Sequence, residues 1–135
     1  MSNIPYPKLV QFNDSKWALT QDYYCILPNN NRLTCTKGFT TDLASAGIVG
    51  SILIGGKASG NHTRAVWIHD LLYSIEAYNR EICDDIFLVI MKEHGVSWFK
   101  RNAMWGAVRL FGDSVWSNHT LESLEYNGRF VNIVR

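Results

Sequence analysis

The segment of residues 80–93 carries apolar side chains on almost every side of a helix, and this feature constrains the fold most. Its apolar residues are Ile82, Ile86, Phe87, Leu88, Val89, Ile90 and Met91. A helix that is apolar all round is normally buried, so other elements are expected to cover it. Helical patterns at residues 63–73 and 97–111 are joined to it by short connections. Helices connected in this way pack as neighbours, so the chain predicts a three-helix cluster.

Capping residues mark the expected ends of these helices. Asn79 and Ser97 precede the second and third helices, and either Asn61 or Thr63 is placed to cap the first. Short polar side chains at these positions accept hydrogen bonds from backbone N–H groups that the helix leaves unpaired. Gly112 follows the third pattern and is predicted to stop that helix.

The first third of the chain is typical of β-structure. Residues 28–31, Pro-Asn-Asn-Asn, form a turn signal, because Pro fixes the turn entry and Asn tolerates a positive φ. The segments on either side are rich in branched and aromatic residues and predict a β-hairpin. The expected strands cover residues 9–12, 17–19, 22–27 and 32–36, with one more short strand at 130–134.

These segments predict one α+β domain, an N-terminal β-hairpin or small antiparallel sheet packed on a three-helix cluster. A chain of 135 residues with 47% hydrophobic residues can bury a single core. Residues 1–45 are mainly β, 46–62 form a glycine-rich loop, and 63–112 hold the three helices. Residues 113–135 are expected to be a C-terminal tail with the short strand.

Charge and hydropathy exclude several kinds of partner. Thirteen basic and twelve acidic residues leave a net charge of +1, so no nucleic-acid partner is expected. No apolar run approaches the ~20 residues of a membrane span, and residues 1–7 lack the pattern of a signal peptide. Cys25, Cys35 and Cys83 are expected to be reduced thiols in a cytoplasmic protein. A disulfide between Cys25 and Cys35 across the hairpin is the alternative.

One group of polar residues could carry chemistry. His69 and Tyr73 are four apart and share a helix face, with Asp70 beside them. Asp84 lies on the buried face of the second helix and needs a partner there. Antiparallel packing of the two helices would bring Asp84 to His69, fix the imidazole tautomer and leave its other nitrogen as a base. Asp70 and Asp42 could then ligate a hard cation, calcium or magnesium.

The same residues also permit a purely structural interpretation. Asp84 could interact only with the helix dipole, and Tyr73 could be a core aromatic with a tethered hydroxyl. His62, His94 and His119 fall near loops or helix ends and are expected at the surface. The tryptophans and phenylalanines from Trp98 onward are expected in the core or at an interface.

Four motifs follow one another along residues 30–116. They are Gly-Phe-Thr-Thr-Asp-Leu-Ala-Ser at 38–45, His-Asp-Leu-Leu-Tyr at 69–73, Asp84 with Phe87, and Ala-Val-Arg-Leu-Phe-Gly at 107–112. Their order and spacing resemble an uncharacterised family found in tailed bacteriophages and prophages. The resemblance implies a phage-encoded protein of the host cytoplasm or virion. After residue 45 the family continues with an apolar residue and proline, whereas this chain has Ala46-Gly47.

A second resemblance concerns the site. The His-Asp-x-x-Tyr pattern at residues 69–73, the glycines of residues 55–60 and the Asp-x-x-Phe at Asp84 are similar to A2-type phospholipases, including those of parvovirus capsids. The resemblance implies that His69 activates water, Asp70 helps to hold calcium and Asp84 orients His69. The disulfides typical of the secreted enzymes are absent.

Two classes of function therefore remain open. The leading hypothesis is a phage-encoded, metal-assisted hydrolase acting on an ester or similar bond of a lipid or cell-envelope substrate, with His69, Asp84 and Tyr73 as catalytic residues. The alternative is a non-catalytic virion structural or accessory protein, or a protein that binds a host factor, in which the same side chains only hold helices together. Its partners would be phage virion proteins or a component of the host envelope.

Overall fold

The computed structural model describes residues 3–43 and 61–135, so most of the predicted glycine-rich loop lies outside the described residues. Two antiparallel three-stranded sheets have the orders β1-β2-β5 and β3-β4-β6. The strands are β1 (Leu9–Gln11), β2 (Trp17–Leu19), β3 (Tyr23–Ile26), β4 (Arg32–Cys35), β5 (Thr40–Thr41) and β6 (Val131–Val134). The helices are α2 (Thr63–Ser74), α3 (Arg80–Glu93), α4 (Trp98–Ser117) and α5 (Leu121–Gly128).

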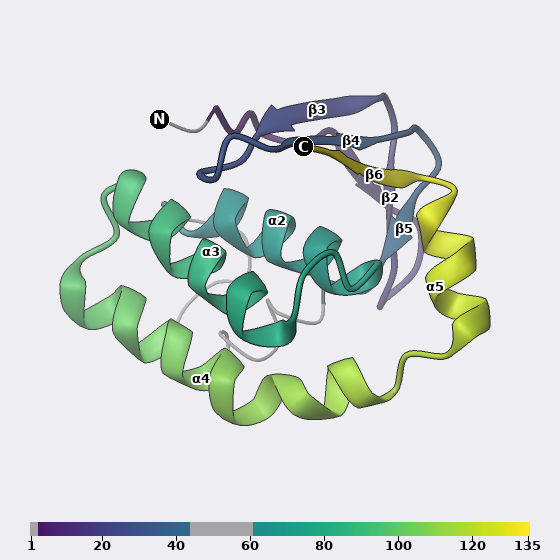
Figure 1. Ribbon diagram of the computed structural model, residues 1–135. Coiled ribbons are helices and arrows are strands. Elements are labelled where there is room, and N and C mark those ends of the chain that lie inside the picture. The colour runs from purple at the N-terminus through teal and green to yellow at the C-terminus, as the bar shows by residue number, and fades with distance from the viewer. Residues whose placement is uncertain (1–2, 44–60) are drawn as a thin grey trace.

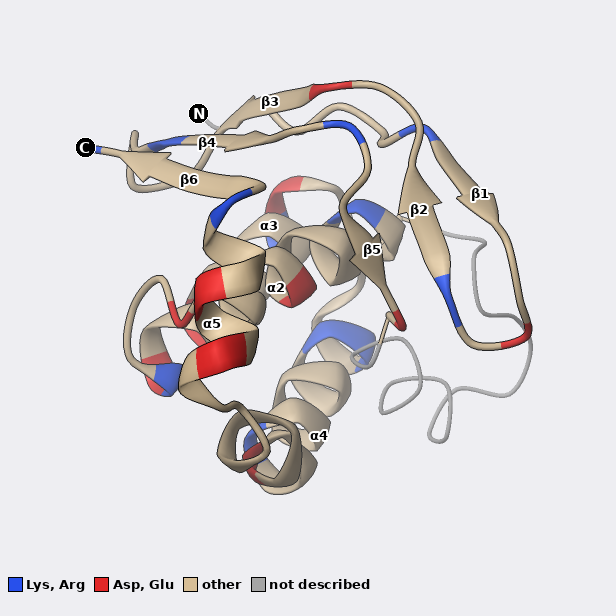
Figure 2. Cartoon of the chain, turned by 90° about the vertical axis from the view of Figure 1, so that its right-hand side faces the viewer, with Lys and Arg blue, Asp and Glu red and all other residues tan. Residues whose placement is uncertain are grey.

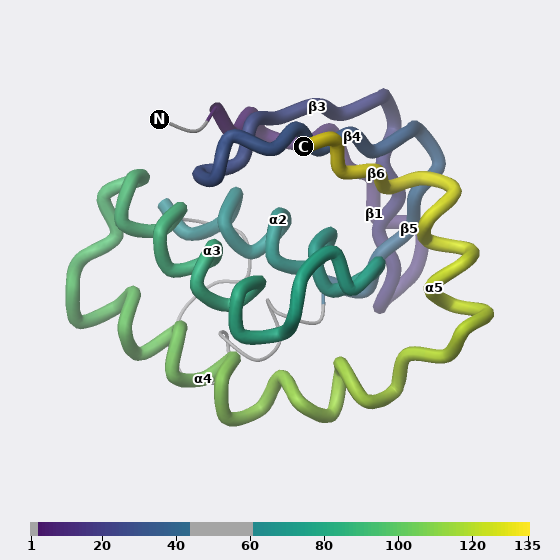
Figure 3. Tube along the Cα trace, in the orientation of Figure 1, coloured from purple at the N-terminus to yellow at the C-terminus, as the bar shows by residue number. Residues whose placement is uncertain are grey.

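This architecture confirms the predicted α+β class. The β3-β4-β6 sheet lies across α2 and α3, α4 runs along the other side of α3, and α5 returns the chain to β6 (Figure 1). Figure 2 shows the β1-β2-β5 sheet beside the first one, with β5 leading towards the helices. The hairpin of β3 and β4 is present, and β6 pairs antiparallel with β4, so the C-terminal strand lies beside the N-terminal hairpin (Figure 3).

The helix buried along most of its length is α2, not the one that the hydrophobic pattern singled out. Nine consecutive residues of α2, Ala65 to Tyr73, are buried. In α3, by contrast, Ile82 is 42% exposed and Val89 is 41% exposed. The reason is the neighbours of each helix. Trp67 of α2 packs against Tyr23 of β3 and against Phe39, and α2 also contacts α3, whereas only part of the surface of α3 is covered by its neighbours α2 and α4.

Two of the predicted caps are confirmed. The Asn79 side chain accepts a hydrogen bond from the backbone of Ile82 at 2.9 Å, and Ser97 accepts one from the backbone of Lys100 at 3.4 Å. The prediction for the first helix is wrong: α2 begins after His62, whose side chain makes no capping hydrogen bond.

Gly112 does not end its helix as predicted, because it serves a packing role inside α4. A Cβ atom at this position would lie 2.8 Å from the Tyr73 hydroxyl and 3.3 Å from Nη1 of Arg80. The absence of a side chain is what allows α4 to approach α2 this closely. The helical region therefore extends beyond residue 112: α4 continues to Ser117, and α5 occupies much of the predicted tail.

The three cysteines are buried and free, as the reduced-thiol interpretation predicts. Cys25 faces Leu33 in the hairpin register and Cys35 faces Tyr23, so the strands do not bring the two thiols opposite each other. Burial raises the pKa of each of the three thiols to about 12, which makes them poor nucleophiles at neutral pH. Among the described residues, no helix has the length and apolar character needed to cross a membrane.

The close approach at Gly112 yields a test of this packing. Gly112→Ala should lower the free energy of unfolding by about 1–3 kcal/mol, because the buried Tyr73 hydroxyl has no room to move away. Gly106→Ala is the matched control in the same helix: its Cβ would meet nothing within 4 Å. There the change should raise stability by about 0.5–1 kcal/mol through helix propensity. Urea unfolding of both variants checks this, and equal effects at the two positions would contradict the described packing.

Candidate functional site

The Asp84 carboxylate is the centre of a buried polar cluster. Its Oδ1 lies 2.6 Å from Nε2 of His69 and accepts a hydrogen bond of 2.7 Å from the Tyr73 hydroxyl. Its Oδ2 accepts a hydrogen bond of 2.8 Å from Nη1 of Arg109, and Nη1 of Arg80 lies 3.6 Å away. We refer to these five residues as the Asp84 cluster. Asp84 and His69 have side chains with 0% exposure.

Three helices supply this cluster. His69 and Tyr73 lie one turn apart on α2 and therefore project from the same face. Asp84 lies near the start of α3, so the C-terminal half of α2 meets the N-terminal end of α3, as the sequence predicts for antiparallel packing. Arg109 comes from α4. The cluster thus fixes the relative positions of α2, α3 and α4.

Electrostatics keep Asp84 ionised. Burial alone raises the pKa of its carboxyl, but hydrogen bonds from His69, Tyr73 and Arg109 outweigh burial and hold the pKa below its ordinary value. The hydrogen bond to Asp84 also raises the pKa of Arg109, and burial followed by the contact with Asp84 raises that of Tyr73.

The ionised carboxylate also fixes the tautomer of His69. A carboxylate only accepts, so Nε2 of His69 must carry the proton of this bond. In the neutral imidazole, Nδ1 is then the basic nitrogen.

A pocket of about 560 Å³ lies beside the cluster, and we call it the Asp42 pocket. Its walls come from segments far apart in the sequence, and it brings together three of the predicted site residues, Asp42, Asp70 and Tyr73. His69 and Asp84 are not among its lining residues. The lining residues are Lys16, Phe39, Thr40, Thr41, Asp42, Asp70, Tyr73, Ser74, Val115, Asn118, His119, Ser123, Tyr126 and Asn127.

The two predicted metal ligands, Asp42 and Asp70, therefore border the same pocket, whereas the predicted base, His69, does not line it. Asp70 is 8% exposed and follows His69 directly on α2. Within residues 3–43 and 61–135, no group of three or more His, Cys, Asp or Glu side chains is arranged to hold a metal ion. A cation at Asp42 and Asp70 would need additional oxygen ligands from the backbone or from water, which calcium and magnesium both accept.

Sequence reasoning missed a second histidine–carboxylate pair in this region. Nδ1 of His119 lies 2.9 Å from Oε2 of Glu76, and His119 lines the Asp42 pocket. His119 is therefore not the surface residue that was predicted: its side chain is only 14% exposed. No local signal could have revealed the pair, since its members lie in two separate connecting segments, 43 residues apart in the sequence.

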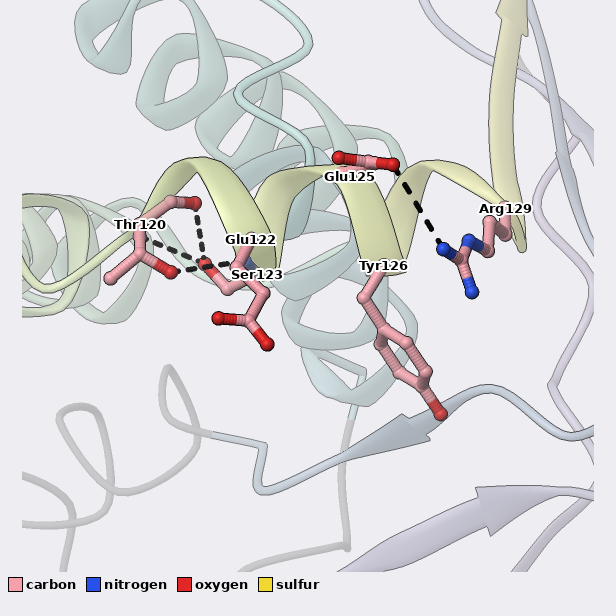
Figure 4. A pocket seen from close by; sticks show the side chains of 6 residues that line it. All are labelled: Thr120, Glu122, Ser123, Glu125, Tyr126 and Arg129. Carbon is pink, nitrogen blue, oxygen red and sulfur yellow. Dashed lines mark hydrogen bonds and ion pairs between the residues drawn. The ribbon is translucent and has the colours of Figure 1, made fainter.

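A further hollow lies along α5; it shares Ser123 and Tyr126 with the Asp42 pocket but is lined by none of the predicted site residues. Thr120 and Ser123 form a capping box at the start of this helix, and Glu125 and Arg129 form an exposed ion pair at 3.9 Å (Figure 4). This hollow is lined by residues at or near α5 alone: Thr120, Glu122, Ser123, Glu125, Tyr126 and Arg129. The Asp42 pocket, which several elements build, is the stronger candidate site.

Comparison with known proteins identifies one relationship. Residues 17–108 match the model of a family described as a protein of unknown function, DUF1353. The matched region includes Asp42, Asp70 and all five residues of the Asp84 cluster except Arg109, which lies one residue beyond it. A search of curated proteins and a search of solved structures gave no match.

The ionised state of Asp84 leads to a prediction about acid stability. Because its pKa in the folded protein lies below the ordinary 3.8, the cluster stabilises the native state above about that pH. The stabilisation is lost as the pH falls through the lower folded value. Asp84→Asn should reduce the free energy of unfolding at neutral pH by about 3–5 kcal/mol, because it leaves the cationic partners without their carboxylate.

The matched control for this change is Asp85→Asn, at the next position of α3. Asp85 is exposed and accepts a single side-chain hydrogen bond, 3.2 Å from Nε1 of Trp105. Its replacement should change stability by no more than about 0.5 kcal/mol. Urea unfolding from neutral pH to pH 3 measures both effects. An Asp84→Asn variant with the same acid dependence as the wild type would refute the assignment of an ionised Asp84.

Proposed function

The chain belongs to the DUF1353 family, whose description assigns no activity, and on this premise we propose that it is a metal-assisted hydrolase. The proposed substrate is an ester or similar bond in a lipid or cell-envelope component. The phage or prophage origin implied by the four motifs is part of the same proposal. The observation that carries it is the 2.6 Å contact between Nε2 of His69 and the Asp84 carboxylate, which Tyr73 connects to a pocket also bordered by Asp70.

His69 is the proposed general base. The bond to Asp84 leaves Nδ1 as the basic nitrogen, and the negative charge of Asp84 stabilises the imidazolium that forms when His69 takes a proton from water. Tyr73 and Arg109 donate to the same carboxylate, so Asp84 is held in one orientation. Asp84, Tyr73 and Arg109 together thus hold the imidazole of His69 in the orientation that a general base needs.

Asp70 and Asp42 are the proposed ligands of calcium or magnesium. Both border the Asp42 pocket, and carboxylate oxygens are the ligands that these hard cations prefer. When bound, the cation would polarise the carbonyl of the scissile bond and stabilise the charge that develops on its oxygen. Asp70 follows His69 on the same helix, so ligand and base would be fixed to one rigid element.

A second candidate function is favoured by the burial of the cluster. Both His69 and Asp84 are 0% exposed, and neither lines the Asp42 pocket. A closed, mutually hydrogen-bonded cluster is what a structural clasp requires, since every buried polar group then has a partner. In that case the protein is a virion structural or accessory component, or binds a host factor, and the cluster only joins its helices.

The two functions differ in the effect of replacing His69. We expect the purified protein to release fatty acid from phospholipid vesicles in the presence of calcium or magnesium, and chelation to remove the activity. His69→Gln should reduce kcat by about 10²–10⁴-fold, the usual contribution of a general base. Fatty-acid release with and without chelator measures both effects.

His62→Gln is the control for that experiment, because the His62 side chain does not cap α2 and lies outside the cluster. It should retain wild-type activity. Circular dichroism of both variants shows whether they fold. An inactive wild type whose His69→Gln variant simply unfolds would favour the structural clasp and overturn the hydrolase.

A further inference from the structure

The pair of His119 and Glu76 has the geometry of an oriented acid–base residue. Oε2 of Glu76 lies 2.9 Å from Nδ1 of His119, and no other carboxylate is close to this imidazole in the part of the chain that the structure describes. A carboxylate at one ring nitrogen fixes the tautomer and leaves the other nitrogen to exchange protons. Nε2 of His119 makes no hydrogen bond to any described residue.

Glu76 is the left-handed residue of the cap that ends α2, so its backbone position is fixed by that helix. Glu76 has φ of 47°, in the left-handed region that residues other than glycine rarely adopt. It follows the end of α2, where its backbone N–H donates to the carbonyl of Tyr73 at 3.1 Å. The backbone N–H of Ala77 donates to the carbonyl of Leu72 at 3.0 Å and completes this cap, which places Glu76 at the end of α2.

The imidazole itself is packed in place. Its ring centroid lies 5.7 Å from that of Trp116, which in turn makes an edge contact with Tyr73 of the Asp84 cluster at 5.0 Å. The side chain keeps 14% of its surface exposed, and His119 is one of the residues lining the Asp42 pocket. His119 therefore combines a fixed orientation with access to the pocket, whereas His69 is fully enclosed.

We infer that His119 is the general acid of the Asp42 pocket and that Glu76 is its positioning residue. The inference rests on the proposed function, because it takes this pocket as the place where the ester is cleaved. It adds a second histidine with a separate role, which would divide the two proton transfers of hydrolysis between the two histidines.

Water attacks the ester carbonyl and forms the C–O bond of a tetrahedral intermediate. Its proton goes to Nδ1 of His69, the base of the proposed function, which is 0% exposed and must become accessible when the ester binds. When the intermediate collapses, the bond between the carbonyl carbon and the leaving oxygen breaks, and protonated His119 gives its Nε2 proton to that oxygen. The products are a carboxylic acid and an alcohol, and exchange with solvent water restores both histidines.

The decisive experiment varies the leaving group at a constant acyl chain. An alkyl ester needs a proton donor because an alkoxide is a poor leaving group, whereas a p-nitrophenyl ester releases a stabilised phenolate without one. His119→Gln should reduce kcat for the alkyl ester by about 10²-fold and leave kcat for the p-nitrophenyl ester within about 2-fold of wild type. His69→Gln, which removes the base for water attack, should reduce both.

Two more variants are needed: Glu76→Gln tests the positioning role of Glu76, and His62→Gln is the control. Glu76→Gln should produce a smaller loss with the same dependence on the leaving group, a pattern that a merely structural change would not give. His62→Gln should resemble the wild type with both esters. Circular dichroism establishes that each variant folds.

The outcomes separate this inference from the proposed function. If the wild type cleaves both esters and His119→Gln reduces both equally or neither, the general-acid role is overturned and the hydrolase stands. If the folded wild type cleaves neither ester with calcium or magnesium present, the hydrolase fails and this inference fails with it. A loss of kcat in His119→Gln that is confined to the alkyl ester supports both the general-acid role and the hydrolase.

Discussion

An ionised carboxylate enclosed by helices is the constraint on which this structure depends. Asp84 has no contact with solvent, so its charge must be met by protein groups, and it is met by donors from two other helices and from its own. Removing water from such a charge costs several kcal/mol unless the partners are positioned accurately. The relative placement of α2, α3 and α4 is therefore fixed by more than apolar packing, which by itself tolerates sliding and rotation.

The constraint also explains which parts of the site the sequence could reveal. A carboxylate on an apolar helix face needs a partner, and His69 and Tyr73 occupy one face of the preceding helix. Those facts alone lead to the contacts found at Oδ1. Arg109 could not be assigned to Oδ2, because a solvated arginine and a buried partner look alike in sequence. The contact between His119 and Glu76 could be predicted even less, since it depends on how the chain after α4 passes the end of α2.

For the fold, too, the sequence predicted the features that depend on local signals and missed those that depend on tertiary packing. Alternating and turn-forming residues located the β3-β4 hairpin, and caps located α3, because these signals are local. The burial of α2 was missed, because burial depends on what packs against a helix and not only on its own side chains. Gly112 was misinterpreted for a related reason: glycine serves both helix ends and close helix contacts, and only the neighbouring Tyr73 distinguishes the two.

The pairing of β6 with β4 has a consequence for how the chain reaches its native state. The central strand of the β3-β4-β6 sheet receives its second neighbour from the far end of the described chain. During synthesis on the ribosome, β4 must remain an open edge while every helix is made, and an open edge is a template for pairing with other chains. Contacts of such long sequence separation slow folding, so the nascent protein is most exposed to aggregation just before β6 emerges.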